Sequence, residues 1–155
     1  MKLSTKGRYA VMAMVDLACH CQGAPVSLAD IARRQEISLS YLEQLFARLR
    51  RNGLVRSVRG PGGGYLPART LTETRIADII LAVDEPIRAT RCPLGTGAGC
   101  KSDKSRCLTH DLWDELGNQI HLYLSSVSLA DVCERRILGT SRLIAAEPRL
   151  RVAAQ

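Results

Sequence analysis

Residues 37–66, ISLSYLEQLFARLRRNGLVRSVRGPGGGYL, place a short basic helix directly before a glycine-rich hairpin. Apolar residues recur at helical spacing up to Gly53, a residue type that commonly ends helices. Two β-prone runs, 54–59 and 65–66, then flank the glycine and proline run at 60–64. Because glycine permits positive φ and proline restricts φ, this run predicts a tight turn that pairs the two strands as a hairpin.

A second short helix precedes this segment and completes a motif. Residues 27–35, SLADIARRQ, have one apolar face and lie about four residues before the next helix. Each helix starts with a serine followed three positions later by an acidic residue, a spacing typical of helix capping: Ser27 with Asp30, and Ser40 with Glu43. Two short helices joined by a tight connection, the second one basic, predict a helix-turn-helix, and the hairpin that follows predicts its wing.

Helical patterns continue on both sides of this motif. An amphipathic segment capped by Ser4 or Thr5 precedes it, an apolar helix is predicted over residues 76–83, and a long helix is predicted from Thr109. A further capping pair begins at Ser128. The predicted fold class is mainly α: a winged helix-turn-helix DNA-binding domain with a long C-terminal dimerisation helix.

The excess positive charge is concentrated in the part of the chain that carries the motif. Residues 1–70 contain 11 Lys and Arg against 4 Asp and Glu, whereas residues 71–155 contain 11 of each kind. The net charge of +7 therefore belongs to the first part. Such an asymmetry predicts a polyanionic partner, most often nucleic acid. The length of 155 residues and the hydrophobic content of 46% allow one main domain.

The N-terminal end of the second helix carries the residues predicted to read DNA bases. A recognition helix enters the major groove with this end at the base edges, where glutamine pairs with adenine and glutamate accepts from cytosine. The predicted base-reading residues are Ser38, Ser40, Glu43 and Gln44. A plain capping role is the alternative for Ser40 and Glu43.

Four arginines extend the predicted DNA-binding surface. Arg48, Arg50 and Arg51 follow on the same helix and are better placed to contact phosphates. Arg59 lies at the base of the glycine turn, where a wing can place an arginine in the negative potential of a narrow minor groove. The alternative for Arg59, a solvated hairpin arginine, is disfavoured by the neighbouring basic helix.

A separate stretch, residues 89–113, sets three cysteines and a histidine among glycines, lysines and serines. Cys92, Cys100, Cys107 and His110 have the spacing C-x7-C-x6-C-x2-H, and four such donors suit one tetrahedral zinc or one small iron–sulfur cluster. Structural zinc sites usually contain closer cysteine pairs, so the wide spacing favours a labile cluster that serves a sensor. Three unliganded thiols are the remaining alternative, although exposed thiols oxidise readily.

Cysteine usage and hydropathy also bear on the compartment. The N-terminal residues are interrupted by charges, and no stretch of about 18 apolar residues occurs. We therefore expect a cytoplasmic protein with no membrane partner, in which six cysteines do not form a disulfide framework. Cys19, His20 and Cys21 are consecutive on a helix and point in different directions, so they and Cys133 are predicted to be packing residues.

The helix predicted from Thr109 carries an apolar stripe about four turns long. Its members are Leu112, Trp113, Leu116, Ile120, Tyr123 and Leu124. A second copy of the chain would bury this stripe and would place two recognition helices on one DNA duplex. The prediction is a homodimer, and core packing within a monomer is the alternative.

The motifs KGRYAV, ISLSYLEQLFARLRRNGLV, VRGPGGGY, AVDE and CLTH resemble those of the IscR family, bacterial regulators of iron–sulfur cluster assembly, and the resemblance covers about residues 1–137. It implies a homodimeric winged-helix transcription factor that carries a 2Fe-2S cluster on Cys92, Cys100, Cys107 and His110. It also implies that the loaded factor represses its own cluster-assembly operon, that it regulates other genes, and that the iron–sulfur assembly machinery donates the cluster.

Individual residues carry further implications of this resemblance. Ser40, Gln44 and Arg59 match positions that contact DNA. Glu43 matches a glutamate that helps to keep the cluster-free form off the cluster-dependent class of operator, while that form still binds a second class. The ligand loop of this chain is three residues longer in total than the cysteine spacing familiar in the family.

With the resemblance included, the predicted divisions are a winged helix-turn-helix at 1–70, a connecting helix at 71–90, an iron–sulfur cluster-binding loop at 91–110, a dimerisation helix with a following helix at 111–138, and a flexible tail at 139–155. A zinc-stabilised winged-helix regulator without switching is the main alternative function. A small iron–sulfur electron carrier would leave the wing and the concentrated charge unexplained. An enzyme is not expected, because the sequence shows no paired carboxylates, no C-x-x-C motif and no Ser-His-Asp grouping.

Overall fold

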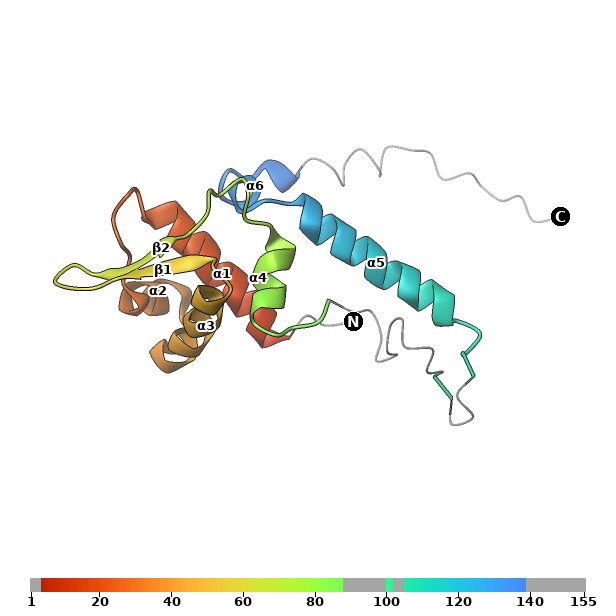
Figure 1. The fold of residues 1–155 in the computed structure, drawn as a ribbon. Coiled ribbons are helices and arrows are strands. Elements are labelled where there is room, and N and C mark those ends of the chain that lie inside the picture. Colours follow the sequence, from red (N-terminus) through yellow and green to blue (C-terminus); the bar gives the residue numbers. More distant parts are fainter. Residues whose placement is uncertain (1–3, 88–99, 102–104, 139–155) are drawn as a thin grey trace.

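The computed structural model describes residues 4–87, 100–101 and 105–138, so the predicted tail at 139–155 lies outside the described residues. Its helices are α1 (Thr5–His20), α2 (Leu28–Gln35), α3 (Leu39–Arg51), α4 (Ile76–Ala82), α5 (His110–Ser126) and α6 (Leu129–Cys133), followed by a 3-10 helix, η1 (Arg136–Leu138). Its strands are β1 (Val55–Val58) and β2 (Gly64–Pro67). In Figure 1, the other elements gather around α1, while α5 extends away from them. This mainly helical arrangement agrees with the predicted one.

Serine side chains cap both helices of the helix-turn-helix. Ser27 caps α2, and the hydroxyl of Ser38 accepts a hydrogen bond from Tyr41 N at 3.3 Å to cap α3. The predicted capping pair of Ser40 and Glu43 is therefore wrong, because the helix starts earlier and Ser40 lies within its first turn. Both of these side chains are left exposed to solvent.

The hairpin of β1 and β2 forms the wing predicted after α3. The strands are antiparallel, with Val58 opposite Gly64 at the turn end. Tyr65 exchanges two backbone hydrogen bonds with Val26, of 3.0 and 2.8 Å, so the segment before α2 borders the hairpin. A side chain at position 64 would collide with the backbone of Val26, which explains the glycine there.

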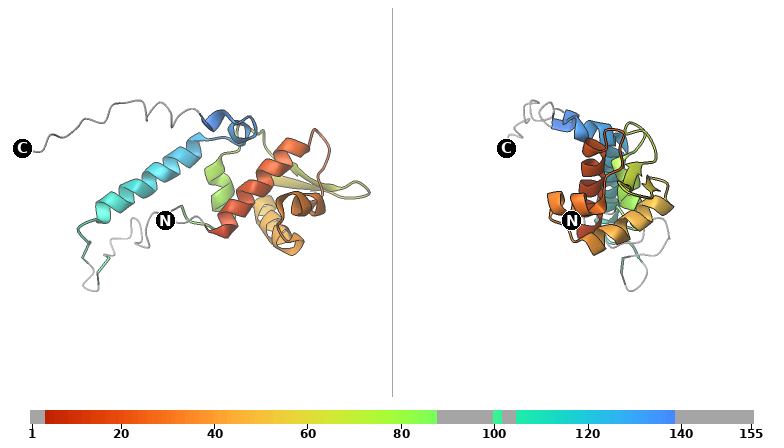
Figure 2. Two further views of the ribbon diagram at one scale, coloured as in Figure 1. Left: turned by 180° about the vertical axis from the view of Figure 1, so that it is seen from behind. Right: turned by 90° about the vertical axis from the view of Figure 1, so that its left-hand side faces the viewer.

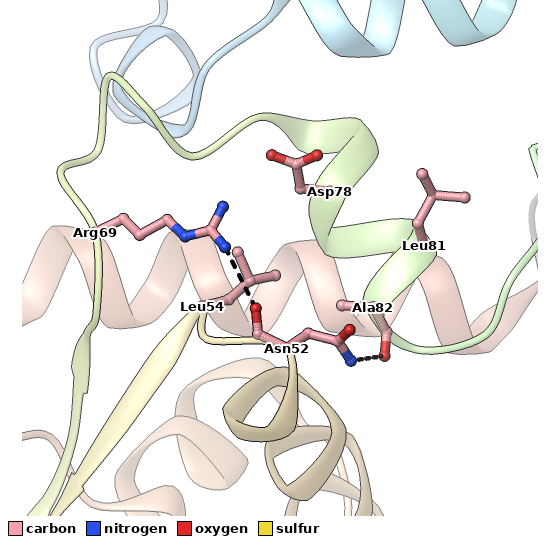
Figure 3. Close-up of a pocket in the computed structure, with 6 residues that line it drawn as sticks. All are labelled: Asn52, Leu54, Arg69, Asp78, Leu81 and Ala82. Atoms are coloured by element: carbon pink, nitrogen blue, oxygen red, sulfur yellow. Dashed lines mark hydrogen bonds between the residues drawn. The ribbon is translucent and has the colours of Figure 1, made fainter.

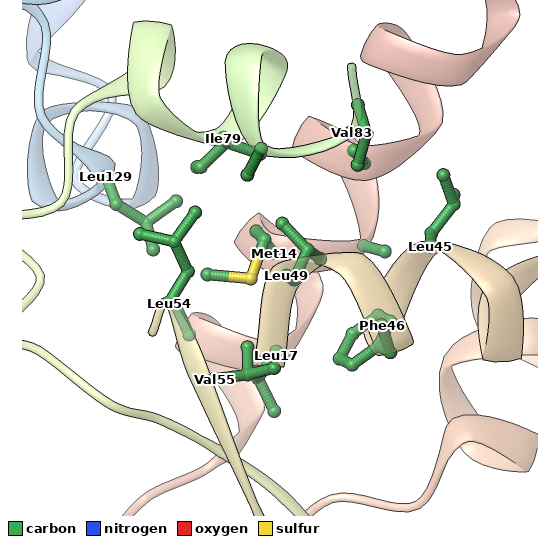
Figure 4. Packing of buried hydrophobic residues seen from close by; sticks show 14 of the residues in the cluster. Met14, Leu17, Leu45, Phe46, Leu49, Leu54, Val55, Ile79, Val83 and Leu129 are labelled. Carbon is green, nitrogen blue, oxygen red and sulfur yellow. The ribbon is translucent and has the colours of Figure 1, made fainter. Parts of the chain in front are cut away.

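The hydrophobic core lies between α1, α3 and α4 and is closed at one end by α6 (Figure 4). Its fully buried side chains include Met14, Leu17, Phe46, Leu49, Ile79 and Leu129. Burying one side chain of this size stabilises the fold by about 1.5–3 kcal/mol. The ring of Phe46 also meets the ring of Tyr65 edge-on, with 4.9 Å between centroids, and this contact attaches the wing to α3.

A buried carboxylate joins α1 to α2. Asp16 accepts hydrogen bonds from Arg34 Nη2 at 2.6 Å and from Gln35 Nε2 at 2.7 Å. Burial tends to raise the pKa of Asp16, but the hydrogen bonds from Arg34 and Gln35 outweigh it and hold the pKa below its usual value. The first helix of the helix-turn-helix is thereby fixed against α1.

A short backbone bridge anchors the base of α5 to the start of α4. Ile76 N donates to Val127 O at 3.0 Å, and Leu129 N donates to Thr74 O at 2.8 Å. The predicted capping pair at Ser128 is confirmed as a full capping box at the start of α6. The long helix therefore leaves the winged domain from a fixed point.

Candidate DNA-binding surface and ligand loop

The helix α3 has a buried face and an exposed face. The buried face contributes Leu42, Leu45, Phe46 and Leu49 to the core. Ser40, Glu43 and Gln44 are exposed and lie three and four positions apart, so they share the opposite side of the helix. The cap Ser38 is exposed just before them. The N-terminal half of α3 thus presents all four predicted base-reading residues to solvent.

The predicted DNA-contacting arginines have different surroundings. Arg50 and Arg51 are exposed, and neither forms an ion pair within the described part of the chain. Arg59 is exposed beside the glycine turn of the wing. Arg48 instead turns toward α4. Sequence reasoning missed Arg56, which is exposed on β1, although it lies on the same predicted strand run as Arg59.

Arg48 belongs to a set of contacts between the C-terminal half of α3 and the end of α4. Its guanidinium donates to Val83 O at 3.3 Å and forms an ion pair with Asp84. One turn later, Asn52 Nδ2 donates to Ala82 O at 3.1 Å. We call these five residues the α3–α4 latch. The latch holds the recognition helix to the segment that leads into the ligand loop.

A hollow of about 240 Å³ lies beside the latch, where α3, the base of the wing and α4 meet (Figure 3). It is lined by Asn52, Leu54, Arg69, Asp78, Leu81 and Ala82. Across it, Arg69 Nη2 donates to Asn52 O at 3.5 Å. The segment after β2 is therefore connected to the same end of α3 as the latch.

The residues that follow the latch cap the N-terminus of α1. Glu85 accepts a hydrogen bond from Ser4 N at 2.7 Å and further bonds from the Ser4 hydroxyl and the Gly7 N–H. Partial burial tends to raise the pKa of Glu85, but these hydrogen bonds outweigh it and lower the pKa. A carboxylate is also favoured at the positive end of a helix. Immediately before the ligand loop, the chain is thus bonded to both α3 and α1.

The structure brings two of the four predicted metal ligands together. Cys100 Sγ lies 3.0 Å from His110 Nδ1, and His110 is buried as the first residue of α5. Cys107 is nearby in the chain: its carbonyl accepts from His110 N at 3.0 Å, and its Sγ lies 3.8 Å from Thr109 Oγ1. Cys92 lies outside the described residues. Among the side chains that the structure describes, no three His, Cys, Asp or Glu are arranged to hold a metal.

The chemistry of the pair fits a metal centre. A thiol sulfur and an imidazole nitrogen at hydrogen-bonding distance are two donors that zinc and iron–sulfur clusters both accept. His110 is only 7% exposed as the first residue of α5, whereas Cys100 is exposed. The pair therefore supplies two of the four donors that the sequence predicts.

Much of the predicted apolar stripe on α5 faces solvent. Leu112 is 62% exposed, Leu116 38% and Tyr123 53%. Figure 2 shows this helix standing away from the winged domain, and its C-terminal part packs against the core at Leu124. The chain does not bury the whole stripe in its own core. None of the described helices is long and apolar enough to cross a bilayer.

Comparison with known proteins places the chain in a family. The family Rrf2, described as an iron-dependent transcriptional regulator, matches residues 3–135. The chain belongs to the Rrf2 family. It is 58% identical to the HTH-type transcriptional regulator IscR of Photorhabdus laumondii over 132 residues, which are 85% of this chain and 79% of that protein. The resemblance inferred from the sequence is confirmed.

Two solved structures of Rrf2-type regulators share the winged-helix fold. IscR of T. potens superposes with a TM-score of 0.70 at 39% identity and covers 88% of each chain. CymR, the global cysteine regulator of B. subtilis, superposes with a TM-score of 0.71 at 32% identity, covering 87% of this chain and 98% of that one. The predicted fold class is confirmed. The chain is an IscR-type helix-turn-helix regulator of the Rrf2 family and not an enzyme.

Proposed function

We propose that this Rrf2 regulator senses iron–sulfur clusters in the bacterial cytoplasm and represses a cluster-assembly operon when it carries a 2Fe-2S cluster, while it also regulates other genes. The proposed ligands are Cys92, Cys100, Cys107 and His110. The distance of 3.0 Å between Cys100 Sγ and His110 Nδ1 carries the proposal, because it joins donors of two segments at the start of α5. The proposed partners are double-stranded operator DNA, a second copy of the chain, and the iron–sulfur assembly machinery as cluster donor.

The cluster would supply a labile, redox-active iron centre whose occupancy reports the supply of clusters. The residues of the chain connect that occupancy to DNA. Cys100 and His110 hold the loop to the start of α5, and the other end of the loop follows the latch and Glu85. Ordering the loop therefore acts on a segment bonded to α3 and α1, which changes the population of the DNA-competent form.

The exposed side chains of α3 and the wing support the proposed DNA contacts. Base edges in the major groove are assigned to the N-terminal residues of α3: Ser38, Ser40, Glu43 and Gln44. Phosphates are assigned to Arg50 and Arg51, and the minor groove to Arg59. Arg48 is assigned to the latch instead, because Val83 O and Asp84 already engage its guanidinium.

The exposed stripe of α5 supports a homodimer. An isologous contact between two α5 helices would remove Leu112, Leu116 and Tyr123 from water. It would also join the two winged domains so that their recognition helices reach successive turns of one duplex. Dimer formation then serves both the stability of α5 and the affinity for DNA.

The proposed function is tested on protein purified without oxygen. We expect visible absorption together with about two iron and two sulfide per chain, and we expect Cys92→Ala to lose both. Colourless protein with one zinc would support the zinc-stabilised regulator instead. Operator affinity is then measured by mobility shift for the loaded and the cluster-free protein. Equal affinity at every operator would contradict cluster sensing.

A further inference from the structure

Three cysteines lie outside the ligand loop, and two of them meet across the fold. Cys133, at the end of α6, packs on the C-terminal part of α1, where Cys19 lines the same hollow as Val132. Cys133 Sγ also lies 4.0 Å from Val15 O, one turn before Cys19 on α1. The third thiol, Cys21, donates to Ala18 O at 3.5 Å, within the last turn of α1. Packing of α6 on α1 therefore creates a pair of thiols that the sequence does not indicate.

The two thiols have different access to solvent. Cys19 is exposed, and it lines an open hollow of about 400 Å³ together with Val15 and Val132. Cys133 is partly buried. Burial, followed by the interaction with the nearby Cys19 side chain, raises the pKa of the Cys133 thiol to about 12. Cys133 therefore keeps its proton at neutral pH, and small oxidants reach Cys19 first.

We propose that Cys19 and Cys133 form an oxidation site that reacts with hydroperoxides and closes to a disulfide between α1 and α6. The packing of Cys133 against α1 one turn from Cys19, the hollow that Cys19 shares with Val132, and the access to Cys19 carry this proposal. It concerns neither the ligand loop nor DNA, so it holds whether or not the chain senses clusters.

The reaction balances with one peroxide. The Cys19 thiolate attacks an oxygen of hydrogen peroxide, the O–O bond breaks, and the leaving hydroxide takes up a proton to become water. Cys19 becomes a sulfenic acid. The sulfur of Cys133 then attacks the sulfur of Cys19, the S–O bond breaks, and the oxygen leaves with the proton of Cys133 as a second water. Two thiols are oxidised to one disulfide, and a dithiol reductant reverses the change.

The cross-link would join elements that are far apart in the chain. It connects the central helix of the winged domain to α6, which directly follows the base of α5. The loop that it closes contains the helix-turn-helix, the wing and the ligand loop. Closing so long a loop restricts the unfolded chain, so the oxidised protein should unfold at a temperature about 5 °C higher or more.

Peptide mapping of the full-length, cluster-free chain tests the site. The protein is treated with hydrogen peroxide, the remaining thiols are blocked, and the chain is cut with trypsin and with a protease that cleaves after glutamate. Glu115 lies between Cys107 and Cys133, so Cys133 is recovered on a fragment without any ligand cysteine. We expect this fragment to be linked to the one that holds Cys19, and the link to disappear with dithiothreitol.

Two serine variants assign the link. Cys21→Ser should keep the cross-link and the rise in unfolding temperature, because the Cys21 thiol is bonded to Ala18 O of its own helix and is not part of the proposed pair. Cys19→Ser should lose both, while its reduced form unfolds within about 2 °C of wild type because the position is exposed. Wild type that forms sulfenic acid at Cys19, trapped with dimedone, but no link to Cys133 would overturn the proposal. A link that survives in Cys19→Ser would overturn it as well.

Discussion

The Asp16 carboxylate is fully buried, and its partners Arg34 and Gln35 both come from α2. We expect Asp16→Ala to lower the free energy of unfolding by about 2–4 kcal/mol, because the variant leaves a partly buried guanidinium without its partner. Urea denaturation measures the difference. Arg33→Ala is the matched control: its ion pair is exposed, so its loss should cost less than about 0.5 kcal/mol. Equal losses in the two variants would contradict the role of Asp16.

The contribution of Asp16 should also depend on pH. Its pKa in the folded chain lies below the ordinary value of 3.8, so acid protonates this carboxyl in the unfolded chain first. The stabilisation is therefore complete above that value and is lost as the pH falls through the lower pKa of the folded form. Unfolding free energies of wild type and Asp16→Asn, measured from neutral to acidic pH, should converge only below pH 3.8. If the difference between the unfolding free energies of wild type and Asp16→Asn already narrows near neutral pH, the effect belongs to another titrating group.

Glu43 is the exposed carboxylate on the face of α3 that is proposed to read bases. An unpaired carboxylate in the major groove penalises operators that offer it no donor, and we infer that the loaded form repositions it. Replacing Glu43 with Ala should let the cluster-free protein bind the cluster-dependent operator about 10-fold more tightly or better. A mobility-shift titration measures this affinity. As a control, Glu115→Ala removes the same charge from α5 and should leave the operator affinity of the cluster-free protein unchanged. If the Glu43 variant also binds the operator with unchanged affinity, the hypothesis is rejected.

At the scale of elements, the α3–α4 latch is the connection between the ligand loop and the recognition helix. We expect Asp84→Asn to bring the operator affinities of loaded and cluster-free protein closer together, because it removes the ion pair with Arg48. Asparagine suits this position, since Asp84 has a φ of 57° and Asn tolerates left-handed backbone.

The control for the latch is another arginine of α3. Arg50→Ala should weaken the operator affinity of the loaded and of the cluster-free protein by the same factor, about 3–10-fold. It should also reduce the salt dependence of that affinity by the amount expected for about one phosphate contact. Mobility shifts at several salt concentrations measure both effects. If Asp84→Asn also weakens the two forms equally, the latch does not transmit the state of the loop.

The sequence predicts the elements well because their signals are local. Capping serines, the glycine turn and helical periodicity each involve residues a few positions apart, and α3, the wing and α6 formed where they indicate. The cap of α3 was misplaced because Ser38 and Ser40 both have suitable side chains, and only the backbone decides between them. The latch and the pair of Cys19 with Cys133 were missed because such contacts join distant residues and leave no spacing in the chain.

At the scale of the whole molecule, the exposed stripe of α5 carries the proposed homodimer. We expect the wild-type chain to sediment as a dimer and Leu116→Arg to sediment as a monomer, because a charge in an apolar contact is strongly unfavourable. Asn118→Arg is the matched control, since it adds the same charge on the opposite, exposed side of α5. Sedimentation velocity separates the two states. A monomeric wild type, or dissociation by both variants, would contradict the assignment of the stripe.

The same helix is anchored at its C-terminal end, where the backbone of Thr74 and Leu129 bridges its base to the start of α4. With 17 residues at about 1.5 Å each, α5 reaches about 25 Å from this pivot to the end that carries His110. A tilt of about 5° at the pivot therefore swings the far end by about 2 Å. We infer that the helix can act as a lever arm, so that a small pull at its tip produces a torque at the root of α4.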